Sequence, residues 1–482
     1  MSNLTNDGRP DYMPPVRVAV VPLIFLLLLI GGMLVFISVD AVAEYSWAAL
    51  FAASGVCVAL GARYGFVSRK AMTWGLRRSA AQILPAIPLL IFIALIATTW
   101  MLSGVVPLLM HAGMGLLSPD VFLVITCLVC AGVSLLTGSS WTTIATVGVA
   151  FMGMGAGMGF SMGWTAGAII SGAYFGDKMS PLSDTTVIAA STCGVDLMKH
   201  IRYMCYTSGP AMLIALTVYG CVGMYVGTES SAGDIAQLRY SLAQTFNLTP
   251  WIAVIPVITG LLLILRLPTL LTLALSAAMG LAGIYIFQPQ LLGTCGADSF
   301  SGTLMMLTRG CELSTGSATM DMLTATSGAL GMMPTVILLT GSMTFAGVMI
   351  GTGMLTSLTN AFTQRLQKRS SLVGTTVASG IMLNAATADQ YLSIIIGGNM
   401  FSNVYHRQNL DPTVLSRTIE DSTSVTSVLL PWNSCGVTQS AVLGVSTVIY
   451  APFCIFNILS PVMSLTMACI GFRIRRLKPA TA

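Results

Sequence analysis

The stretch that decides the fold is GDKMSPLSDTT, residues 176–186. It places three charged side chains, one proline and several hydroxyl groups in a chain that is otherwise apolar enough for lipid. Ionisable groups at membrane depth are costly and rare, so such a polar island indicates a functional site. A second island lies in the other half of the chain, at residues 417–421 and 431–434. Two polar islands, one in each half, are typical of a solute pathway.

The sequence around the islands has the composition of a membrane protein. Its 482 residues are 55% hydrophobic and 8% charged, with a mean hydropathy of +0.83, whereas soluble domains carry about 25% charged residues. The first apolar run, residues 16–39, has spanning length and no convincing cleavage site, so we expect it to be retained. We therefore expect an all-α polytopic membrane protein with about 10–12 transmembrane segments.

The basic residues are dispersed in short groups, although the net charge is +5. This pattern sets membrane topology and does not indicate nucleic-acid binding. Placing every group in the cytoplasm puts the polar connection at residues 288–332 outside and predicts that both termini are cytoplasmic. The groups are Arg9 with Arg17, residues 63–78, residues 199–202, Arg266, residues 365–369 and residues 473–478.

Motifs of other protein classes are incomplete in this chain. Cys127 and Cys130 form a C-x-x-C pair, but no second Cys or His pair completes a metal site. The eleven cysteines are scattered mostly through apolar segments, so no disulfide scaffold is indicated. Residues 159–163 read G-x-S-x-G, yet they lie in a membrane segment without acid and His partners. The sequence therefore does not predict an enzyme.

Landmarks recur in the two halves at similar spacing. Each half contains a helix proline, a polar break, an aspartate and a Ser-Pro or Gly-Pro step. The first set follows a basic group and the second follows the outer connection, so we expect inverted repeats with broken helices or re-entrant hairpins. The landmarks are Pro85, 137–141, Asp177 and 207–210 in the first half, and Pro334, 384–389, Asp421 and 458–461 in the second.

This recurrence predicts the organisation of the chain. The expected parts are N-terminal helices with a cytoplasmic interfacial segment at 1–82, a first inverted repeat at 83–227, connecting helices with an outer loop at 228–332, and a second inverted repeat at 333–482.

Interrupted helices in inverted repeats are the membrane solution for a central binding site. The candidate breaks are the Gly-Ser-Ser turn within residues 136–141 and the segment 384–387. Backbone groups freed at a break persist only against protein, water or a bound solute. Helix N-termini at the breaks would favour anions, and carbonyls at the C-termini would favour cations.

The islands supply the oxygen ligands that a hard cation such as sodium prefers. Burial disfavours the charged form of an aspartate and a bound cation favours it, so one carboxylate can hold either a proton or a cation. We expect Asp177 and Asp421 to form the charged sodium-binding core, and Arg417 to bind a carboxylate if it faces the cavity. The predicted ion- or substrate-binding residues are Thr137, Ser139, Asp177, Ser180, Asp184, Thr185, Thr186, Asn384, Thr387, Asp389, Asp421, Ser422 and Asn433.

Simpler roles are open for some of these side chains. Asp177 could pair with Lys178 at a helix end, and Asp184 could cap a helix. Glu420 is expected to pair with Arg417, one helical turn away.

The chain contains the motifs 136–141 (LTGSSW), 166–186 (AGAIISGAYFGDKMSPLSDTT), 415–422 (LSRTIEDS), 431–436 (PWNSCG) and 443–446 (LGVS). These motifs resemble the NhaC family of sodium/proton antiporters, over about residues 75 to 465. The resemblance implies a bacterial inner-membrane secondary transporter that needs no cofactor and moves sodium ions and protons. The pattern departs at Val187, where an Asn is expected, and this departure removes one potential amide ligand.

The expected function is exchange of sodium for protons by alternating access in a multi-pass protein. Its partners would be the lipid bilayer, small ions or a small organic solute, and a second copy of the chain in a homodimer. The alternative is a sodium- or proton-coupled transporter of a small carboxylate or amino acid, such as a malate/lactate exchanger. A membrane-embedded enzyme and a passive channel are the rivals from other classes.

Overall fold

The computed structural model describes residues 13–65, 67–84, 86–229, 232–265, 267–313, 321, 324–363 and 369–476. Within these ranges the regular structure is helical, apart from one isolated antiparallel bridge between Leu410 and Arg476. The predicted landmarks Arg9, Pro85 and Arg266 lie outside the described residues, as do residues 364–368 and 477–482. The expectation of an all-α protein is confirmed.

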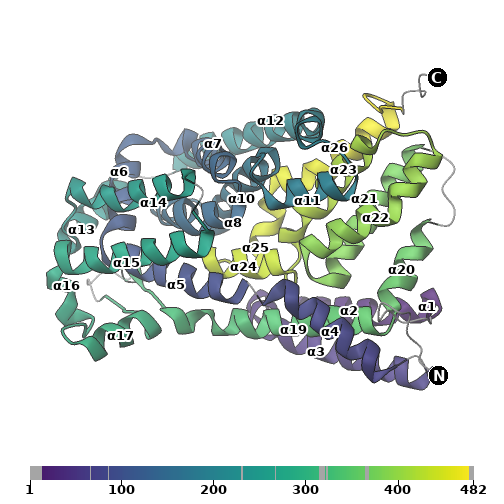
Figure 1. Ribbon diagram of the computed structural model, residues 1–482. Helices are drawn as coiled ribbons and strands as arrows, with labels where there is room; N and C mark the ends of the chain where they lie inside the picture. Colours follow the sequence, from purple (N-terminus) through teal and green to yellow (C-terminus); the bar gives the residue numbers. More distant parts are fainter. Residues whose placement is uncertain are drawn as a thin grey trace.

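The N-terminal helices form a layer against a helix from the second half of the chain. Helix α19 packs along both α3 and α4, as Figure 1 shows along the lower edge of the molecule. Gly75 of α4 makes this approach close, because a Cβ there would lie 2.3 Å from the Gly347 carbonyl oxygen. The N-terminal helices are α1 (Val16–Ala19), α2 (Val21–Phe36), α3 (Val39–Arg63) and α4 (Arg69–Ile83).

The first half of the chain is built around the pair α7 and α10, the most extensively packed helix pair. Gly172 and Gly176 of α10 face α7 so closely that a Cβ would lie within 2.2 Å of a carbonyl oxygen of Cys127 or Ala131. The helices here are α5 (Ala86–Leu102), α6 (Val105–Leu116), α7 (Pro119–Thr137), α8 (Ser140–Thr143), the π-helical turn η1 (Ile144–Gly148), α9 (Val149–Gly157), α10 (Met162–Met179), α11 (Asp184–Thr192) and α12 (Leu197–Glu229).

Connecting helices follow the first half in the sequence and precede the second, and they lie at the left end of the molecule in Figure 1. They are α13 (Ala232–Thr245), η2 (Pro250–Ala253), α14 (Val254–Ile264), α15 (Thr269–Phe287), α16 (Pro289–Thr294) and α17 (Phe300–Arg309). A disulfide joins Cys295 to Cys311, which flank α17. The expectation that the cysteines form no disulfide framework is corrected to this extent, because the cysteine count says nothing of which two thiols meet in space.

The second half contains a second π-helical turn, η4, directly after α23. Its helices are η3 (Ala329–Met332), α19 (Met333–Gly351), α20 (Met354–Thr363), α21 (Arg369–Thr387), α22 (Gln390–Arg407), α23 (Pro412–Ile419), η4 (Glu420–Ser424), η5 (Ser427–Leu429), α24 (Ser434–Leu443), α25 (Thr447–Tyr450), η6 (Ala451–Phe453) and α26 (Ile455–Ile470).

Six described helices are long and apolar enough to cross a membrane, and three bent helix pairs bring the number up to nine. The bends measure 65° between α5 and α6, 92° between α13 and α14, and 91° between α24 and the helix turns after it. The chain is therefore a multi-pass membrane protein with broken helices, as expected. The number of up to nine spans is lower than the predicted ten to twelve segments. The prediction also counted the more polar central helices, such as α10 and α22, as membrane spans.

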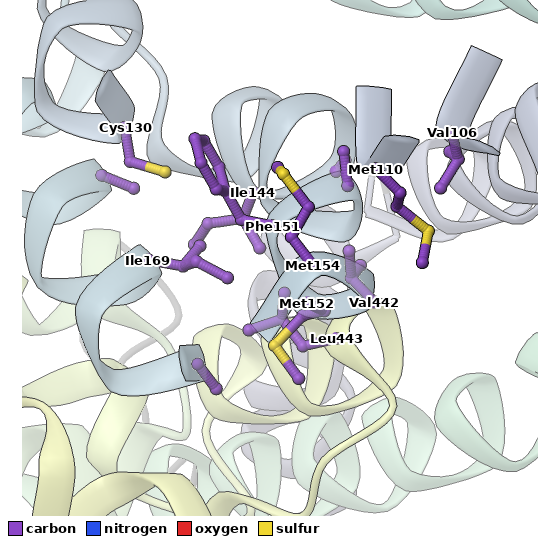
Figure 2. Close-up of a cluster of buried hydrophobic side chains, with 14 of the residues drawn as sticks. Val106, Met110, Cys130, Ile144, Phe151, Met152, Met154, Ile169, Val442 and Leu443 are labelled. Atoms are coloured by element: carbon purple, nitrogen blue, oxygen red, sulfur yellow. The ribbon is translucent and has the colours of Figure 1, made fainter. Parts of the chain in front are cut away.

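The halves share one core. Figure 2 shows side chains from α6, α7, α9, α10 and α24 gathered around Phe151 of α9. Helices in lipid associate through close van der Waals packing, for which small residues are needed. Gly155 of α9 meets this need, because a Cβ there would lie 2.3 Å from the Thr165 hydroxyl of α10. This packing places α24, from the second half, beside α9 and η1 of the first.

Candidate functional site

The first predicted break is confirmed between α7 and α8. Gly138 ends α7 in the left-handed conformation, with φ 69°. Ser139 then caps α8, because its hydroxyl oxygen accepts a hydrogen bond from the Thr142 backbone N–H at 3.2 Å. The Ser139 N–H in turn donates to the Thr137 hydroxyl at 3.4 Å. Local side chains thus satisfy backbone groups that lipid would leave unpaired.

The second break lies at the end of the predicted segment rather than within it. Residues 384–387 remain the last turn of α21, and the helix ends only when Ala388 adopts φ 52°. Asp389 then caps α22 by accepting a hydrogen bond from the Leu392 N–H at 2.8 Å, and its own N–H donates to the Thr387 hydroxyl at 3.2 Å. The second break therefore repeats the hydrogen bonds of the first.

This repetition gives a residue-by-residue correspondence between the two halves of the chain. Residues 137 and 139 correspond to 387 and 389, an offset of 250 residues. At the same offset, Ser183 and Asn433 cap α11 and α24, and Gly194 and Gly444 follow these helices with φ 66° and 67°. The offset pairs Asp177 with Ser427 rather than with Asp421. The domain division and its inverted orientation remain predictions.

A short turn connects α10 to α11 within the first polar island, so that the two ends of the island lie close together. The Ser180 hydroxyl donates to the Leu135 carbonyl oxygen at 2.8 Å, and the Thr186 hydroxyl donates to the Lys178 carbonyl oxygen at 3.1 Å. Ser183, not Asp184, is the N-cap of α11. The capping role considered for Asp184 is therefore wrong, because the helix begins one residue earlier than that role requires.

The two breaks and this turn enclose a cavity of about 300 Å³. Three of its lining residues are carboxylates, namely Asp177, Asp184 and Asp389, and no Lys, Arg or His is among the lining residues that the structure describes. The cavity is lined by Leu89, Thr137, Gly138, Ser139, Trp141, Thr142, Asp177, Leu182, Ser183, Asp184, Thr185, Thr269, Asp389, Gln390, Tyr391 and Ser434.

Six of the residues named from the sequence line this cavity, and the others lie outside it. Those in the lining are Thr137, Ser139, Asp177, Asp184, Thr185 and Asp389. The others hold backbone groups or ion pairs nearby; for example, the Asn384 amide donates to the Thr423 carbonyl oxygen at 2.6 Å. The residues outside the lining are Ser180, Thr186, Asn384, Thr387, Arg417, Asp421, Ser422 and Asn433.

Two of the cavity carboxylates are held by helix starts. Asp177 accepts two hydrogen bonds from Ser140, the first residue of α8, through the backbone N–H and the hydroxyl. Asp389, 3% exposed, caps α22 and accepts a long hydrogen bond of 3.5 Å from the Ser434 hydroxyl. Helix N-termini carry partial positive charge, so these positions stabilise ionised carboxylates at the cavity wall.

Asp421 belongs to a separate buried ion pair. Its Oδ1 contacts the Lys178 ammonium and accepts hydrogen bonds from the hydroxyls of Thr207 at 3.1 Å and Ser460 at 3.0 Å. Arg417 approaches the other oxygen, with its Nε 3.8 Å from Oδ2, and stacks over Tyr203. The expected Glu420–Arg417 pair is therefore corrected, because Arg417 turns toward Asp421. Lys178 likewise pairs with Asp421 and not with Asp177.

The sequence reasoning missed five polar residues of the lining: Thr142, Thr269, Gln390, Tyr391 and Ser434. Each lies in the first turn of a helix that begins at the cavity, so a helix start directly after a break is the signal that would have found them. Val187, which departs from the resembled pattern, is 42% exposed and lies outside the cavity lining.

The described residues contain no group of three or more His, Cys, Asp or Glu side chains able to hold a metal ion. The cavity carboxylates are thus spread along its wall, and a cation there would take hydroxyl and backbone oxygens as further ligands.

Comparison with known proteins agrees with this geometry. The Na+/H+ antiporter family matches residues 13–206 and 172–472. The chain belongs to this family. A Na(+)/H(+) antiporter NhaC from Alkalihalophilus pseudofirmus is 33% identical over 423 residues, which cover 86% of this chain and 89% of that protein.

Other relatives carry names with different solutes. A malate-2H(+)/Na(+)-lactate antiporter from Bacillus subtilis is 31% identical over 84% of this chain and 85% of its own length. An arginine/ornithine antiporter from Halobacterium salinarum is 31% identical over 98% of this chain and 96% of its own length. The similarity therefore extends to antiporters named for sodium and protons, for organic acids and for amino acids.

Proposed function

We propose that this protein exchanges sodium ions for protons across the membrane. The observation that carries the proposal is the cavity, whose described lining residues include three aspartates and several hydroxyl groups and no basic side chain. Such a lining attracts small cations, and mixed carboxylate and neutral oxygens are the ligands that hard cations prefer. The family and the named sodium/proton antiporters among the relatives support the same assignment.

The aspartates supply the coupling in this proposal. A carboxylate in a confined cavity binds either a proton or a sodium ion, because each neutralises the same charge. Asp177 from the first half and Asp389 from the second contribute to one cavity, so movement of one half against the other would carry the bound cation between the two sides. Sodium and protons are the transported species, and the proposal needs no cofactor.

We place the protein in the bacterial inner membrane with both termini in the cytoplasm. Figure 1 shows α1, which contains Arg17, and α20, which precedes the basic group at 365–369 in the sequence, at the right end of the molecule. Helices α16 and α17, with the Cys295–Cys311 disulfide, lie at the left end. Disulfides persist in oxidising compartments, and basic loops stay in the cytoplasm. Both features support the same orientation.

The direct test uses everted membrane vesicles from a host that lacks its own sodium/proton antiporters. A pH-sensitive dye reports the acidified lumen, and a sodium pulse should release the accumulated protons. The matched control is the Asp177→Asn variant, expressed to the same level. An absence of response to sodium, lithium and potassium from mildly acidic to alkaline pH would refute cation/proton exchange.

A second candidate is coupled transport of a small amino acid or carboxylate. Four helices of eight or more residues, α11, α15, α22 and α24, begin at the cavity wall, and such N-termini favour a carboxylate. The aspartates would hold the ammonium group of an amino acid, and the volume is at the lower limit for ligand pockets, about 300 Å³. Sodium-dependent uptake of labelled amino acids, malate and lactate into proteoliposomes distinguishes this candidate from sodium/proton exchange.

A further inference from the structure

A second pocket, of about 560 Å³, lies between the N-terminal layer and helix α22. Its walls come from α4, the end of α19, α20 and α22, and we call it the α4–α22 pocket. Figure 1 shows α20 beside α22 toward the right end of the molecule, and these two helices contact each other. No described residue lines both this pocket and the cavity that contains Asp177. Its volume is within the range of pockets that hold small ligands, about 300–1,000 Å³.

The deeper wall of the α4–α22 pocket is apolar. Ile350, Leu355 and Leu392 are buried there, and Ile395 and Ile396 of α22 are half-buried. The three buried side chains belong to the apolar cluster that also includes side chains of α2 and α3. Such a wall favours contact with a hydrocarbon chain, because apolar surface is then removed from water.

The rim of the pocket is polar and carries one positive charge. It consists of Arg78, which is half-buried, and of Thr356 and Asn399, which are exposed. The Arg78 guanidinium lies over the Trp74 ring, with its Cζ 5.3 Å from the ring centroid. Among the lining residues that the structure describes there is no Asp or Glu. Because a planar guanidinium matches the geometry of a phosphate group, an anionic phosphate complements this rim.

We propose that the α4–α22 pocket binds a phospholipid with an anionic head group. The phosphate lies at Arg78, and one acyl chain lies along Ile395 and Ile396. A soluble anion would leave the apolar wall in contact with water. A zwitterionic lipid would gain less from the positive charge, because its own cationic group opposes the attraction. Basic pockets between transmembrane helices are typical binding sites for anionic head groups at the cytoplasmic side of a membrane.

The surroundings of the pocket also favour an anionic lipid. Helix α4 carries four basic side chains and no acidic one, in the sequence RKAMTWGLRRSAAQI. Arg77, which adjoins Arg78, is exposed. Trp74 lies on the same helix, and tryptophan is enriched at membrane–water interfaces. A basic surface at this position raises the local concentration of anionic lipids beside the pocket.

Leu392 connects the pocket to the proposed ion site. Its side chain lines the pocket, and its backbone N–H donates a hydrogen bond of 2.8 Å to Asp389, which lines the other cavity. A lipid in contact with both α4 and α22 holds α22 against the N-terminal layer and stabilises the described conformation. This restraint on α22 rests on the proposed exchange function, in which one half moves against the other. Binding of the lipid does not depend on it.

Thermal unfolding of the purified full-length protein in detergent tests the binding. Phosphatidylglycerol, which is anionic, should raise the unfolding temperature more than the same concentration of phosphatidylcholine. Arg78→Gln removes the positive charge and should need about tenfold more phosphatidylglycerol for the same rise. The matched control is Arg77→Gln, at the exposed neighbour outside the pocket lining, which should respond like wild type. An equal response of Arg78→Gln and wild type would overturn the proposal.

A free phosphate distinguishes a lipid site from a simple anion site. Glycerol 3-phosphate has the phosphate group of the lipid but no acyl chain, so it should leave the unfolding temperature unchanged. Ile395→Trp fills space at the apolar wall and should weaken the response to phosphatidylglycerol although Arg78 is kept. Stabilisation by glycerol 3-phosphate as large as that by phosphatidylglycerol would overturn the assignment to a lipid.

A measurement on the wild-type chain covers the case in which the variants do not accumulate. Phosphatidylglycerol with a photoactivatable diazirine in its acyl chain is added to the protein in nanodiscs, and mass spectrometry locates the labelled peptides. We expect labelling of α22 that excess phosphatidylglycerol reduces more than excess phosphatidylcholine does. Labelling confined to other helices, or equal reduction by the two lipids, would contradict the inference.

Transport gives the last readout. In proteoliposomes, sodium/proton exchange by the wild-type protein should slow as phosphatidylglycerol replaces phosphatidylcholine, and Arg78→Gln should be less sensitive to this replacement than Arg77→Gln. Equal sensitivity of the two variants would overturn the restraint on α22. An absence of exchange at every lipid composition would overturn the proposed function, whereas the unfolding and labelling results would still decide whether the lipid binds.

Discussion

Ser140 donates two hydrogen bonds to one oxygen of Asp177, from its backbone N–H at 3.1 Å and from its hydroxyl at 2.7 Å. Ser140 is the first residue of α8, and Asp177 lies near the end of α10. The break after α7 thus fixes a carboxylate at the cavity wall. One helix interruption supplies both the position and the electrostatic stabilisation of a charged ligand.

Asp177→Asn should abolish sodium/proton exchange while the protein still folds and inserts. The amide is nearly isosteric with the carboxyl group but carries no charge for a cation or proton to neutralise. Everted vesicles with equal amounts of protein provide the measurement, and Asp298→Asn, at an exposed aspartate, is the matched control. Near-normal exchange by Asp177→Asn would refute the role assigned to this residue.

Ser140→Ala should weaken the apparent sodium affinity and leave the maximal rate largely intact. The variant loses the hydroxyl donor to Asp177 but keeps the backbone donor. Hydrogen bonds to charged groups contribute roughly 1.5 kcal/mol or more, which corresponds to about a tenfold rise in the half-saturating sodium concentration. Ser191→Ala, at an exposed serine of α11, is the control. An unchanged half-saturating concentration would show that this bond does not position the carboxylate for sodium.

The sequence located the breaks because their chemistry is local. Gly138 supplies a left-handed backbone, and a polar residue follows it as a cap. The first polar island also predicted that Asp177 belongs to the site, since an aspartate beside a helix end in an apolar segment has few structural explanations. Both inferences depend on residues that lie within a few positions of one another.

The pairing of distant residues could not be read in the same way. Spacing between landmarks matched Asp177 with Asp421, whereas the helix caps set an offset that pairs Asp177 with Ser427. Lys178 and Asp421 are 243 residues apart, and no local pattern states that they meet. Helix packing decides whether Asp421 faces the cavity or forms an ion pair with Lys178. The periodicity of the sequence does not specify how helices pack.

Lys178→Met should destabilise the protein, because it removes the ammonium group in contact with buried Asp421. Breaking a buried ion pair by removing one partner costs about 3–5 kcal/mol. Asp421→Asn should also destabilise, and the double variant should lose less stability than the sum of the two losses. Thermal unfolding in lipid nanodiscs measures all three variants against wild type. Strictly additive losses would mean that the two side chains do not form a coupled pair.

The Cys295–Cys311 disulfide should report the side of the membrane on which α17 lies. After mild reduction of intact spheroplasts, a membrane-impermeant maleimide is expected to label these cysteines, because a disulfide persists on the oxidising side. Inverted vesicles should be protected. A Cys295→Ser/Cys311→Ser variant gives the background from other thiols. Stronger labelling of inverted vesicles than of spheroplasts would reverse the proposed orientation.

The two breaks predict opposite effects for the reverse substitutions Gly138→Ala and Ala388→Gly. Gly138→Ala places a methyl group in a left-handed residue, and its Cβ would lie 2.6 Å from the Leu182 Cβ and 2.7 Å from the Leu182 carbonyl carbon. Ala388, its counterpart, already holds an alanine at φ 52°. A left-handed conformation costs a non-glycine residue roughly 1–2 kcal/mol, so Ala388→Gly removes this strain.

We therefore expect Gly138→Ala to lower thermal stability and to impair transport, because Leu182 lines the cavity and must move. Ala388→Gly should retain transport and keep or raise the unfolding temperature, since the gain in the folded state offsets the greater freedom of glycine in the unfolded chain. Unfolding temperatures and vesicle exchange rates for both variants decide the matter. If Gly138→Ala were as active and stable as wild type, the first break would not depend on the left-handed turn at residue 138.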